Sequence, residues 1–219
     1  MARTAASNRV ASARTGSVIY NGNFEVKPAV ITAPTNTQAR WVDGTVGGSA
    51  ARSGSGWGAI VIVSPGDVTF DTTVFRSGTA SLRLSTGSAV GSVTVASYRT
   101  NPPVASSLFE LFTLLPNTLY VLSAYIRTNN VAALGAFIEC REFTAAAATV
   151  VTNTSNKLSG TDTTWRSASV TFTTSSTTRF GGFFLRNNVV GNTSDAWFDD
   201  ITLIPASLGR VQASGRVAA

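Results

Sequence analysis

The sequence predicts an all-β protein, a two-sheet antiparallel β-sandwich of the jelly-roll kind, with extended N- and C-terminal arms. Three observations lead to this prediction. Only 13% of the 219 residues are charged, about half the usual share, and Thr, Ser, Ala, Val and Gly take their place. Polar and apolar residues alternate with period two, and turn residues punctuate this alternation. No segment keeps the 3.6-residue period of an amphipathic helix.

Four segments carry the strand signal most clearly. In residues 79–85 the even positions are apolar and the odd positions polar, which predicts a half-buried strand, and residues 168–173 alternate in the same way. Residues 120–126 are apolar at most positions, so we expect a central strand that is covered on both faces. Residues 60–63 form a further short strand, and the Pro, Gly and Asp of 65–67 predict a turn after it.

Dipeptides of turn-forming residues divide the rest of the chain. They predict roughly eight to ten strands, a number and spacing typical of a jelly roll. The predicted turns are Gly47-Gly48, Pro116-Asn117, Asn129-Asn130 and Asn187-Asn188.

The net charge of +6 is concentrated at the two ends of the chain. Residues 1–19 contain Arg3, Arg9 and Arg14 without an acid, and residues 206–219 contain Arg210 and Arg216 without an acid. We therefore expect three parts: a basic arm over 1–19, a jelly roll over 20–205 and a basic tail over 206–219.

Two interpretations of the basic arms remain open. Segments of this composition cannot bury enough apolar surface to offset their ordering entropy, so they either dock on a partner or are solvated ends without a function. For docking, an acidic protein surface suits them better than nucleic acid, because their charge density is low and no aromatic residue is interleaved for base stacking.

Several kinds of chemistry are excluded by composition. The chain has no histidine and a single cysteine, which excludes histidine-based nucleophilic triads, histidine-ligated zinc and intrachain disulfides. Cys140 lies in an apolar stretch and is expected to be a buried small hydrophobe. There is no apolar run of ~20 residues and no signal peptide, so we expect a soluble protein without a membrane partner.

Two pairs of acidic residues are candidates for carboxylate catalysis. Asp199 and Asp200 are adjacent in a predicted strand, so their side chains are expected on opposite faces. Glu139 and Glu142 lie three residues apart and are also expected to diverge. A glycosidase needs two carboxyl groups that converge on one bond, so we predict that the protein is not an enzyme.

Several segments of the chain resemble one known family in their order and spacing. They are 21–25 (NGNFE), 78–83 (GTASLR), 116–127 (PNTLYVLSAYIR), Trp165 leading into 170–173 (VTFT), and 197–203 (WFDDITL). Together they resemble the carbohydrate-binding module family 4/9 group, a galactose-binding-like jelly roll, over about residues 20–205. The resemblance implies a two-sheet β-sandwich without catalytic activity of its own.

The resemblance also implies a structural calcium ion between the start and the end of the domain. Glu25 and one of Asp199 or Asp200 would then be the side-chain ligands, which agrees with the preference of Ca²⁺ for hard oxygen ligands. Alternatively, Glu25 accepts a hydrogen bond from a turn, and the aspartates cap the end of a strand.

Modules of this group bind sugars with exposed aromatic rings and polar side chains. By position, Trp165 and Trp197 are expected to lie in the core, and Trp41 to pack near the entrance of the domain. The candidate sugar-binding residues are Trp57, which lies between glycines, and Tyr98 with its neighbour Arg99. The alternatives are that Trp57 fills a gap from a loop and that Tyr98 is an ordinary sheet residue.

The resemblance and the arms together lead to a functional hypothesis. Modules that resemble this group occur in minor tail and head decoration proteins of bacteriophages. The leading hypothesis is a non-enzymatic structural protein of the virion, whose arms anchor a jelly roll to capsid or tail proteins. The alternative is a free-standing module that recognises host or environmental polysaccharide. A homo-oligomer is compatible with both.

Overall fold

The computed structural model describes residues 19, 22–25, 57–61, 66–86, 91–97, 112–146, 148–189 and 193–206. Within these ranges it contains ten β-strands and no α-helix, which confirms the predicted all-β class. The strands are β1 (Trp57–Val61), β2 (Gly66–Asp71), β3 (Ser81–Thr86), β4 (Gly91–Ser97), β5 (Phe112–Thr113), β6 (Leu119–Phe143), β7 (Thr149–Thr154), β8 (Leu158–Thr173), β9 (Phe180–Val189) and β10 (Ser194–Pro205).

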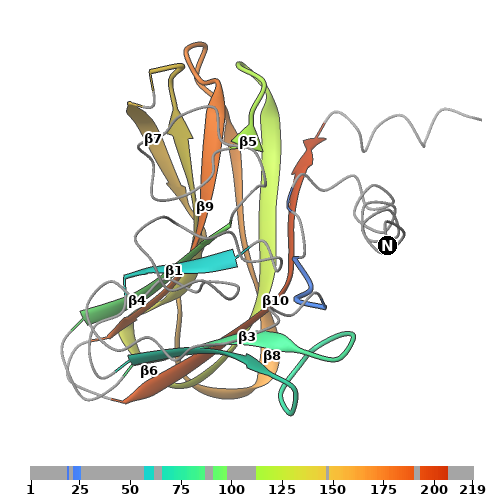
Figure 1. Cartoon of the computed structure of the whole chain (residues 1–219), viewed down its shortest axis with the longest axis vertical. Coiled ribbons are helices and arrows are strands. Elements are labelled where there is room, and N and C mark those ends of the chain that lie inside the picture. The colour runs from blue at the N-terminus through green and yellow to red at the C-terminus, as the bar shows by residue number, and fades with distance from the viewer. Residues whose placement is uncertain are drawn as a thin grey trace, which may run out of the picture.

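All strand pairs are antiparallel, and β6 joins the two halves of the sheet. The strand order is β1-β4-β9-β6-β10-β3-β2, with β5 beside β9 and with β7 and β8 beside β6. The N-terminal part of β6 pairs with β10 and its C-terminal part with β9, so this long strand runs from one half into the other (Figure 1). We call β2, β3, β10 and the start of β6 the β10 layer, and β1, β4, β9 and the end of β6 the β9 layer.

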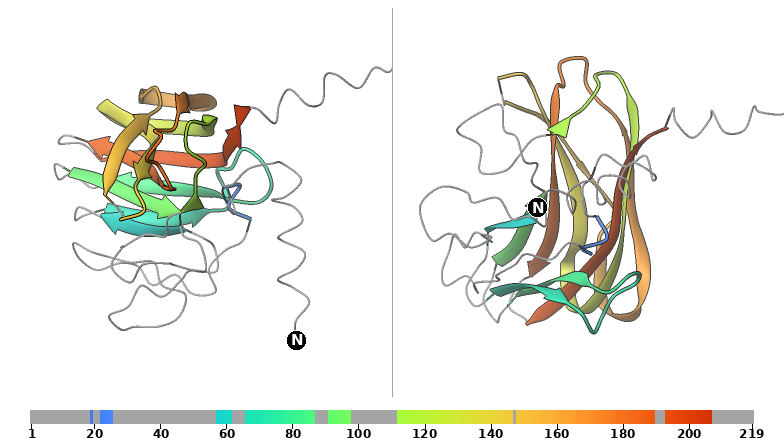
Figure 2. Two further views of the ribbon diagram at one scale, coloured as in Figure 1. Left: turned by 90° about the horizontal axis from the view of Figure 1, so that it is seen from above. Right: turned by 45° about the vertical axis from the view of Figure 1, so that its right-hand side comes forward.

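The two layers face each other across one hydrophobic core, and Figure 2 shows the curl of the sheet from two further directions. Leu82, Leu122 and Phe198 of the β10 layer and Ile138 and Phe183 of the β9 layer belong to the same buried cluster. A hydrogen bond also joins the layers directly, because Asn187 Nδ2 donates to the carbonyl of Leu84 at 2.8 Å. Face-to-face layers with a shared core define the β-sandwich that the sequence predicts.

The predicted strand alternation is confirmed where it is strict. Leu82 and Leu84 of β3 and Ala168 and Phe172 of β8 are buried. In residues 120–126 the strand is confirmed, but only the even-numbered residues are fully buried and the odd ones are half-buried. Coverage on both faces is therefore incomplete. Cys140 is fully buried, as expected.

Two predicted turns are wrong because turn-forming residues lie inside strands. Asn129 and Asn130 belong to β6, where Asn130 has a φ of 54° and the pairing with β8 shifts register. Asparagine tolerates this left-handed conformation, so the chain bends here between the layers without leaving the strand. Asn187 and Asn188 belong to β9.

The segment 60–67 is only partly as predicted. The first strand is Trp57–Val61, and residues 62–65 lie outside the described residues. Gly66 and Asp67 pair with Thr86 and Ser85 as the first residues of β2, so they extend a strand where a turn was expected. The turn at Pro116-Asn117 is present, with Asn117 at a φ of 50°.

Several sequence predictions concern residues outside the described ranges. The division into arm, jelly roll and tail therefore stays a prediction, although the strands of the described part fall within the expected jelly-roll range. In the described part of the chain, no helix is long and apolar enough to cross a membrane. The predicted residues that lie outside the description are Arg3, Arg9, Arg14, Trp41, Gly47, Gly48, Tyr98, Arg99, Arg210 and Arg216.

Candidate functional site

The outer side of the β9 layer carries a cluster of cationic and aromatic side chains. Alternate residues of β6, including Ile138 and Cys140, point into the core, so the residues between them point outward. The outward residues of β9 lie beside them, because Phe137 pairs with Arg186 and Glu139 with Phe184. We call the cluster the basic aromatic face; its members are Phe137, Glu139, Arg141, Lys157, Phe184 and Arg186.

One buried carboxylate holds two guanidinium groups on this face. Glu139 is 5% exposed, and it accepts hydrogen bonds from Arg186 Nε at 2.9 Å and Arg186 Nη2 at 3.2 Å. It also forms a close ion pair with Arg141 Nε. Charge-assisted bonds of this kind satisfy a buried carboxylate and fix the planes of the guanidinium groups. The two arginines are therefore held in defined positions.

The cations lie over the aromatic rings of the face. The guanidinium carbon of Arg141 is 4.5 Å from the ring centroid of Phe184, and that of Arg186 is 5.7 Å away. Lys157 Nζ is 5.1 Å from the centroid of Phe137. These are cation–π distances. Both rings are buried, whereas 33% of the Arg141 side chain is exposed and Lys157 is exposed, so the outermost groups of the face are cations.

Gly135 makes room for Lys157. It has a φ of 79°, and a Cβ at this position would lie 2.7 Å from the Cβ of Lys157. A left-handed backbone and a close approach both favour glycine. Because residue 135 has no side chain, Lys157 can pack closely against β6.

Some polar groups at this site have no hydrogen-bond partner among the described residues. They are the Nη atoms of Arg141, the Nζ of Lys157 and the buried Oδ1 of Asn188, which follows Arg186 on the outer side of β9. Buried polar atoms are normally paired. The face therefore offers the donors of Arg141 and Lys157 to a polar ligand, whereas the Oδ1 of Asn188 is buried.

The predicted sugar-binding residue Trp57 belongs to the same layer. Its backbone pairs with Ser97. The next residue, Gly58, pairs with Ala96, and Ala96 in turn pairs with Phe184, the partner of Glu139. The side chain of Trp57 lies outside the description, as do Tyr98 and Arg99, so their roles stay predictions.

Sequence reasoning missed Glu139, Arg141 and Arg186 as binding residues. Glu139 was considered only as a partner of Glu142, and the expectation that the two diverge is confirmed. Glu142 accepts hydrogen bonds from Asn153 Nδ2 at 2.8 Å and Ser175 N at 2.9 Å, away from the arginines. The signal that was overlooked is the series of residues 137, 139 and 141, which are large or charged between small and apolar ones.

The candidate calcium ligands gather on the connection between β2 and β3. Glu25 Oε1 accepts a hydrogen bond from Thr79 N at 2.7 Å, and Oε2 accepts one from Thr79 Oγ1 at 2.9 Å. Asp199 Oδ2 accepts hydrogen bonds from Arg76 N at 2.8 Å and Ser77 N at 3.1 Å. A hydrogen bond from a turn to Glu25, the alternative to calcium, is thus present.

Asp199 and Asp200 do not point to opposite faces, so this expectation was wrong. The pairing of β10 with β6 shifts register after Asp199, and Asp200 has a φ of 50°. This bulge turns both carboxylates toward the same connection, where Asp200 accepts a hydrogen bond from Ser77 Oγ at 2.6 Å and pairs with Arg76. Bulges re-aim side chains in this manner.

The donor chemistry of this cluster suits calcium, but the present contacts occupy the oxygens. Among the described residues, no three acidic side chains come together as a metal-binding group. Backbone N–H groups bind Asp199 and Glu25, and the guanidinium of Arg76 binds Asp200. Glu25 and one of Asp199 or Asp200 are the residues that would hold an ion, and calcium stays a prediction.

Burial changes the acidity of Asp199. The pKa of this carboxyl is raised to about 6, mainly by burial; backbone hydrogen bonds from Ser77 and Arg76 lower it in part, and the charge of Asp200 adds to the increase. A carboxyl with this pKa is protonated in mildly acidic solution.

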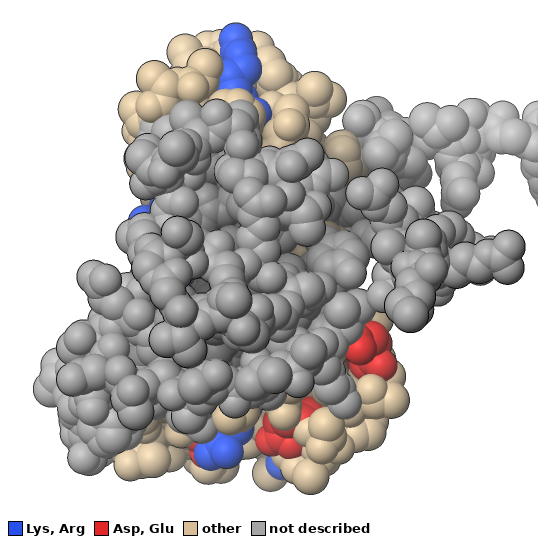
Figure 3. Space-filling view, viewed as in Figure 1, with Lys and Arg blue, Asp and Glu red and all other residues tan. Residues whose placement is uncertain are grey.

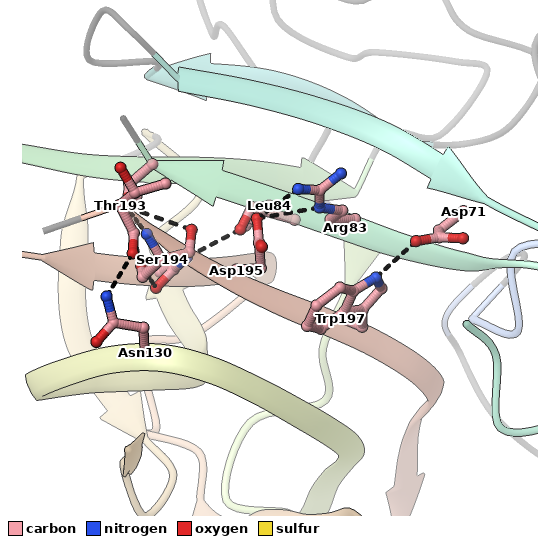
Figure 4. A network of polar contacts seen from close by, with 10 residues as sticks. Asp71, Arg83, Leu84, Asn130, Thr193, Ser194, Asp195 and Trp197 are labelled. Carbon is pink, nitrogen blue, oxygen red and sulfur yellow. Dashed lines mark hydrogen bonds and ion pairs between the residues drawn. The ribbon is translucent and has the colours of Figure 1, made fainter. Parts of the chain in front are cut away.

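A second polar network lies on the outer side of the β10 layer (Figure 4). Trp197 donates its indole N–H to Asp71, and Arg83 binds Asp195. Trp197 is 8% exposed, and the guanidinium carbons of Arg83 and Arg127 are each 5.7 Å from its ring. Trp197 is therefore buried, but on the outer side of its layer and outside the shared core cluster, and Trp165 is only half-buried, so the expectation that both lie in the core is wrong.

The charges of the described surface are unevenly placed. Figure 3 shows acidic side chains near the end that carries β2, β3 and their connection, with basic side chains beside them, and further basic side chains at the opposite end of this view.

No family model and no curated protein matches the chain, but solved structures do. A structure named Family 16 Carbohydrate Binding Module-2 is similar over 63% of this chain and 84% of its own, with 20% identity and a TM-score of 0.44. One named "CBM4 structure and function" is similar over 70% and 96%, with 16% identity and a TM-score of 0.46. The chain also matches 19% of a bacteriophage CBA120 tailspike protein, over 69% of its own length, with 10% identity and a TM-score of 0.47.

Proposed function

We propose that this chain is a non-catalytic carbohydrate-binding protein and that its basic aromatic face is the binding site. The observation that carries the proposal is the shared carboxylate of Glu139, which holds Arg141 and Arg186 beside the rings of Phe184 and Phe137. Polar groups that are fixed before a ligand arrives lose little freedom on binding. The resemblance of the sequence to sugar-binding modules supports the same function.

The groups on the face match the hydrogen-bonding chemistry of sugars. A sugar hydroxyl accepts hydrogen bonds, and the face supplies the Nη donors of Arg141 and the Nζ donors of Lys157. The backbone of Trp57 pairs at the edge of the same layer, next to Gly58, and the role of its ring in binding is a prediction from the sequence.

A binding role without catalysis agrees with the placement of the carboxylates. Glu139 is bound by two arginines, and Glu142 is engaged elsewhere by Asn153 and Ser175. The aspartates of β10 are engaged by the β2–β3 connection. Each of these described carboxylates is thus engaged by arginine, amide, hydroxyl or backbone donors, which supports a role without catalysis.

The test of sugar binding is isothermal titration calorimetry with neutral and acidic polysaccharides. We expect Arg141→Ala to weaken binding about tenfold, because charge-assisted hydrogen bonds are lost. Arg127→Ala is the matched control, since it also removes an arginine that lies over an aromatic ring, but on the β10 layer. Equal weakening by both variants, or no binding to any polysaccharide, would contradict the proposal.

At a finer level, we propose that the protein is part of a phage virion and that its arms anchor it to capsid or tail proteins. Support comes from the sequence: Arg3, Arg9, Arg14, Arg210 and Arg216 lie in terminal segments without acids. Deletion of residues 1–18 should leave a folded domain that no longer joins particles. Unchanged incorporation would contradict this role and leave a free-standing carbohydrate-binding module as the alternative.

A further inference from the structure

We infer that the ligand of the basic aromatic face is an acidic polysaccharide, one whose repeating units carry carboxylate or sulfate groups. The inference rests on the proposed function and narrows the class of ligand. Three features of the face lead to it: its charge balance, the position of its rings and the spacing of its cations.

The first feature is an excess of positive charge. Arg141, Arg186 and Lys157 are accompanied by the single carboxylate of Glu139. Elsewhere on the described surface, ion-paired arginines each have an aspartate of their own, as in Arg76–Asp200, Arg83–Asp195 and Arg166–Asp162. Among the described residues the face therefore carries three cations and one acid, and it will attract anionic groups.

The second feature is that the aromatic rings lie beneath the cations. Arg141 and Arg186 lie against Phe184, and Lys157 lies against Phe137, while both rings are buried. A neutral sugar gains affinity when its ring stacks on an exposed aromatic face, and here the cations hold the ring faces. The outer groups are ammonium and guanidinium donors, which bind carboxylate and sulfate oxygens more strongly than neutral hydroxyls.

The third feature is the spacing of the cations along β6. The guanidinium of Arg141 lies over Phe184, which pairs with Glu139, whereas Lys157 lies over Phe137, two residues earlier on β6. Two residues of a strand span about 7 Å. Separate cationic positions along one strand suit a polymer that carries repeated charges better than a single small anion.

The experiment compares matched polysaccharides on the full-length chain by calorimetry, at low and at high ionic strength. The first pair is polygalacturonate and its carboxyl-reduced, neutral form, and the second pair is dextran sulfate and dextran. We expect binding to at least one acidic polymer, weaker binding at high ionic strength because of screening, and at least about tenfold weaker binding to its neutral partner.

Two variants locate the binding. Lys157→Gln removes an exposed cation and should weaken binding to the acidic polymer about two- to fivefold. Arg127→Gln removes the same charge from the β10 layer and should leave binding unchanged. If Lys157→Gln has no effect, or Arg127→Gln weakens binding as much, the attraction comes from other charges, such as those of the arms, and the inference is overturned.

The outcomes also separate this inference from the proposed function. Equal binding to the acidic and neutral members of both pairs, with loss in Arg141→Ala, would overturn the inference and retain carbohydrate binding. No binding to any of the polymers would overturn both. A preference for dextran sulfate or for polygalacturonate identifies the anionic group that the face recognises.

Discussion

Trp197 on β10 donates its indole N–H to Asp71 on β2 at 2.8 Å, a contact between residues 126 positions apart. The bond crosses β3, which lies between the two strands in the sheet. The other oxygen of Asp71 accepts hydrogen bonds from Thr73 N at 2.8 Å and Val74 N at 3.0 Å, where the connection to β3 begins. One carboxylate thus fixes both the edge strand and the connection that holds the candidate calcium ligands.

The bond between Trp197 and Asp71 predicts the effect of Asp71→Asn. The amide keeps one oxygen for Thr73, but its NH₂ group faces the indole N–H, so the long-range bond is lost. We expect the free energy of unfolding in urea to fall by ~1–3 kcal/mol. Asp162→Asn is the control, since Asp162 makes the same turn contacts with Thr164 and pairs with Arg166 where Asp71 binds Trp197. If both variants lose the same free energy of unfolding, the hydrogen bond from Trp197 contributes little to stability.

The pKa of Asp71 predicts how stability changes in acid. Burial raises this pKa, but hydrogen bonds from Thr73, Trp197 and Val74 outweigh it, so the pKa is lowered from 3.8. A group with a lowered folded pKa contributes stability above its unfolded pKa and loses it as the pH falls through the folded value. In urea titrations, wild type should lose more stability below pH 3.8 than Asp71→Asn. If the stability of wild type and of Asp71→Asn falls in parallel as the pH is lowered, Asp71 is not the source of the loss.

The raised pKa of Asp199 predicts the opposite dependence of stability on pH. Its folded pKa is about 6 against an ordinary value of 3.8, mainly because of burial. The stability from this group is therefore complete below pH 3.8 and is lost as the pH rises through about 6. In the presence of EDTA, wild type should become less stable over this window, and Asp199→Asn should lack the step. If Asp199→Asn shows the same loss of stability over this pH range, the loss comes from another titratable group.

Calcium should act on the same cluster. If Glu25 and Asp199 hold an ion, added Ca²⁺ should raise the Tm of wild type at neutral pH, because a ligand that binds only the folded state stabilises it. Glu25→Gln should reduce this increase in Tm. Asp162→Asn should retain it, since Asp162 is not a candidate calcium ligand and accepts its hydrogen bond from Thr164. If Ca²⁺ and EDTA give the same Tm for wild type, the calcium prediction fails.

Local patterns predicted the parts of the fold that depend on neighbouring residues. Alternation placed Leu82 and Leu84 in the core, and an apolar context placed Cys140 there. Local patterns failed at Asn129-Asn130, because a residue that favours turns also allows a bend inside a strand. The tertiary bonds that satisfy Asn187 come from Leu84 and Ser194, and no local signal shows them.

The candidate site was harder to predict for a related reason. Glu139 becomes a binding residue only through the register that places β6 beside β9, where Arg186 lies 47 positions away. Register between distant strands is set by the packing of the whole sheet and not by either segment alone. The bulge after Asp199 is likewise a property of the strand pair, so alternation assigned Asp200 to the wrong side.

Gly22 joins the first described segment to the last strand, and its substitution should separate them. Its carbonyl accepts a hydrogen bond from Ile201 N at 2.8 Å, and a Cβ would lie 1.9 Å from the carbonyl oxygen of Ile201. A backbone atom cannot rotate away as a side chain does, so residues 22–25 must shift, and the fully buried Phe24 lies among them. Figure 1 shows this segment beside β10.

We therefore expect Gly22→Ala to lower the free energy of unfolding by about 3 kcal/mol or more, as for the loss of a buried phenylalanine from a core. Gly160→Ala is the matched control. Gly160 has a φ of 82° and no atom within 4 Å of its ideal Cβ, so the change should add only backbone strain, about 1–2 kcal/mol. Both are measured by urea unfolding. A smaller loss in Gly22→Ala than in Gly160→Ala would mean that residues 22–25 contribute little to the stability of the sandwich.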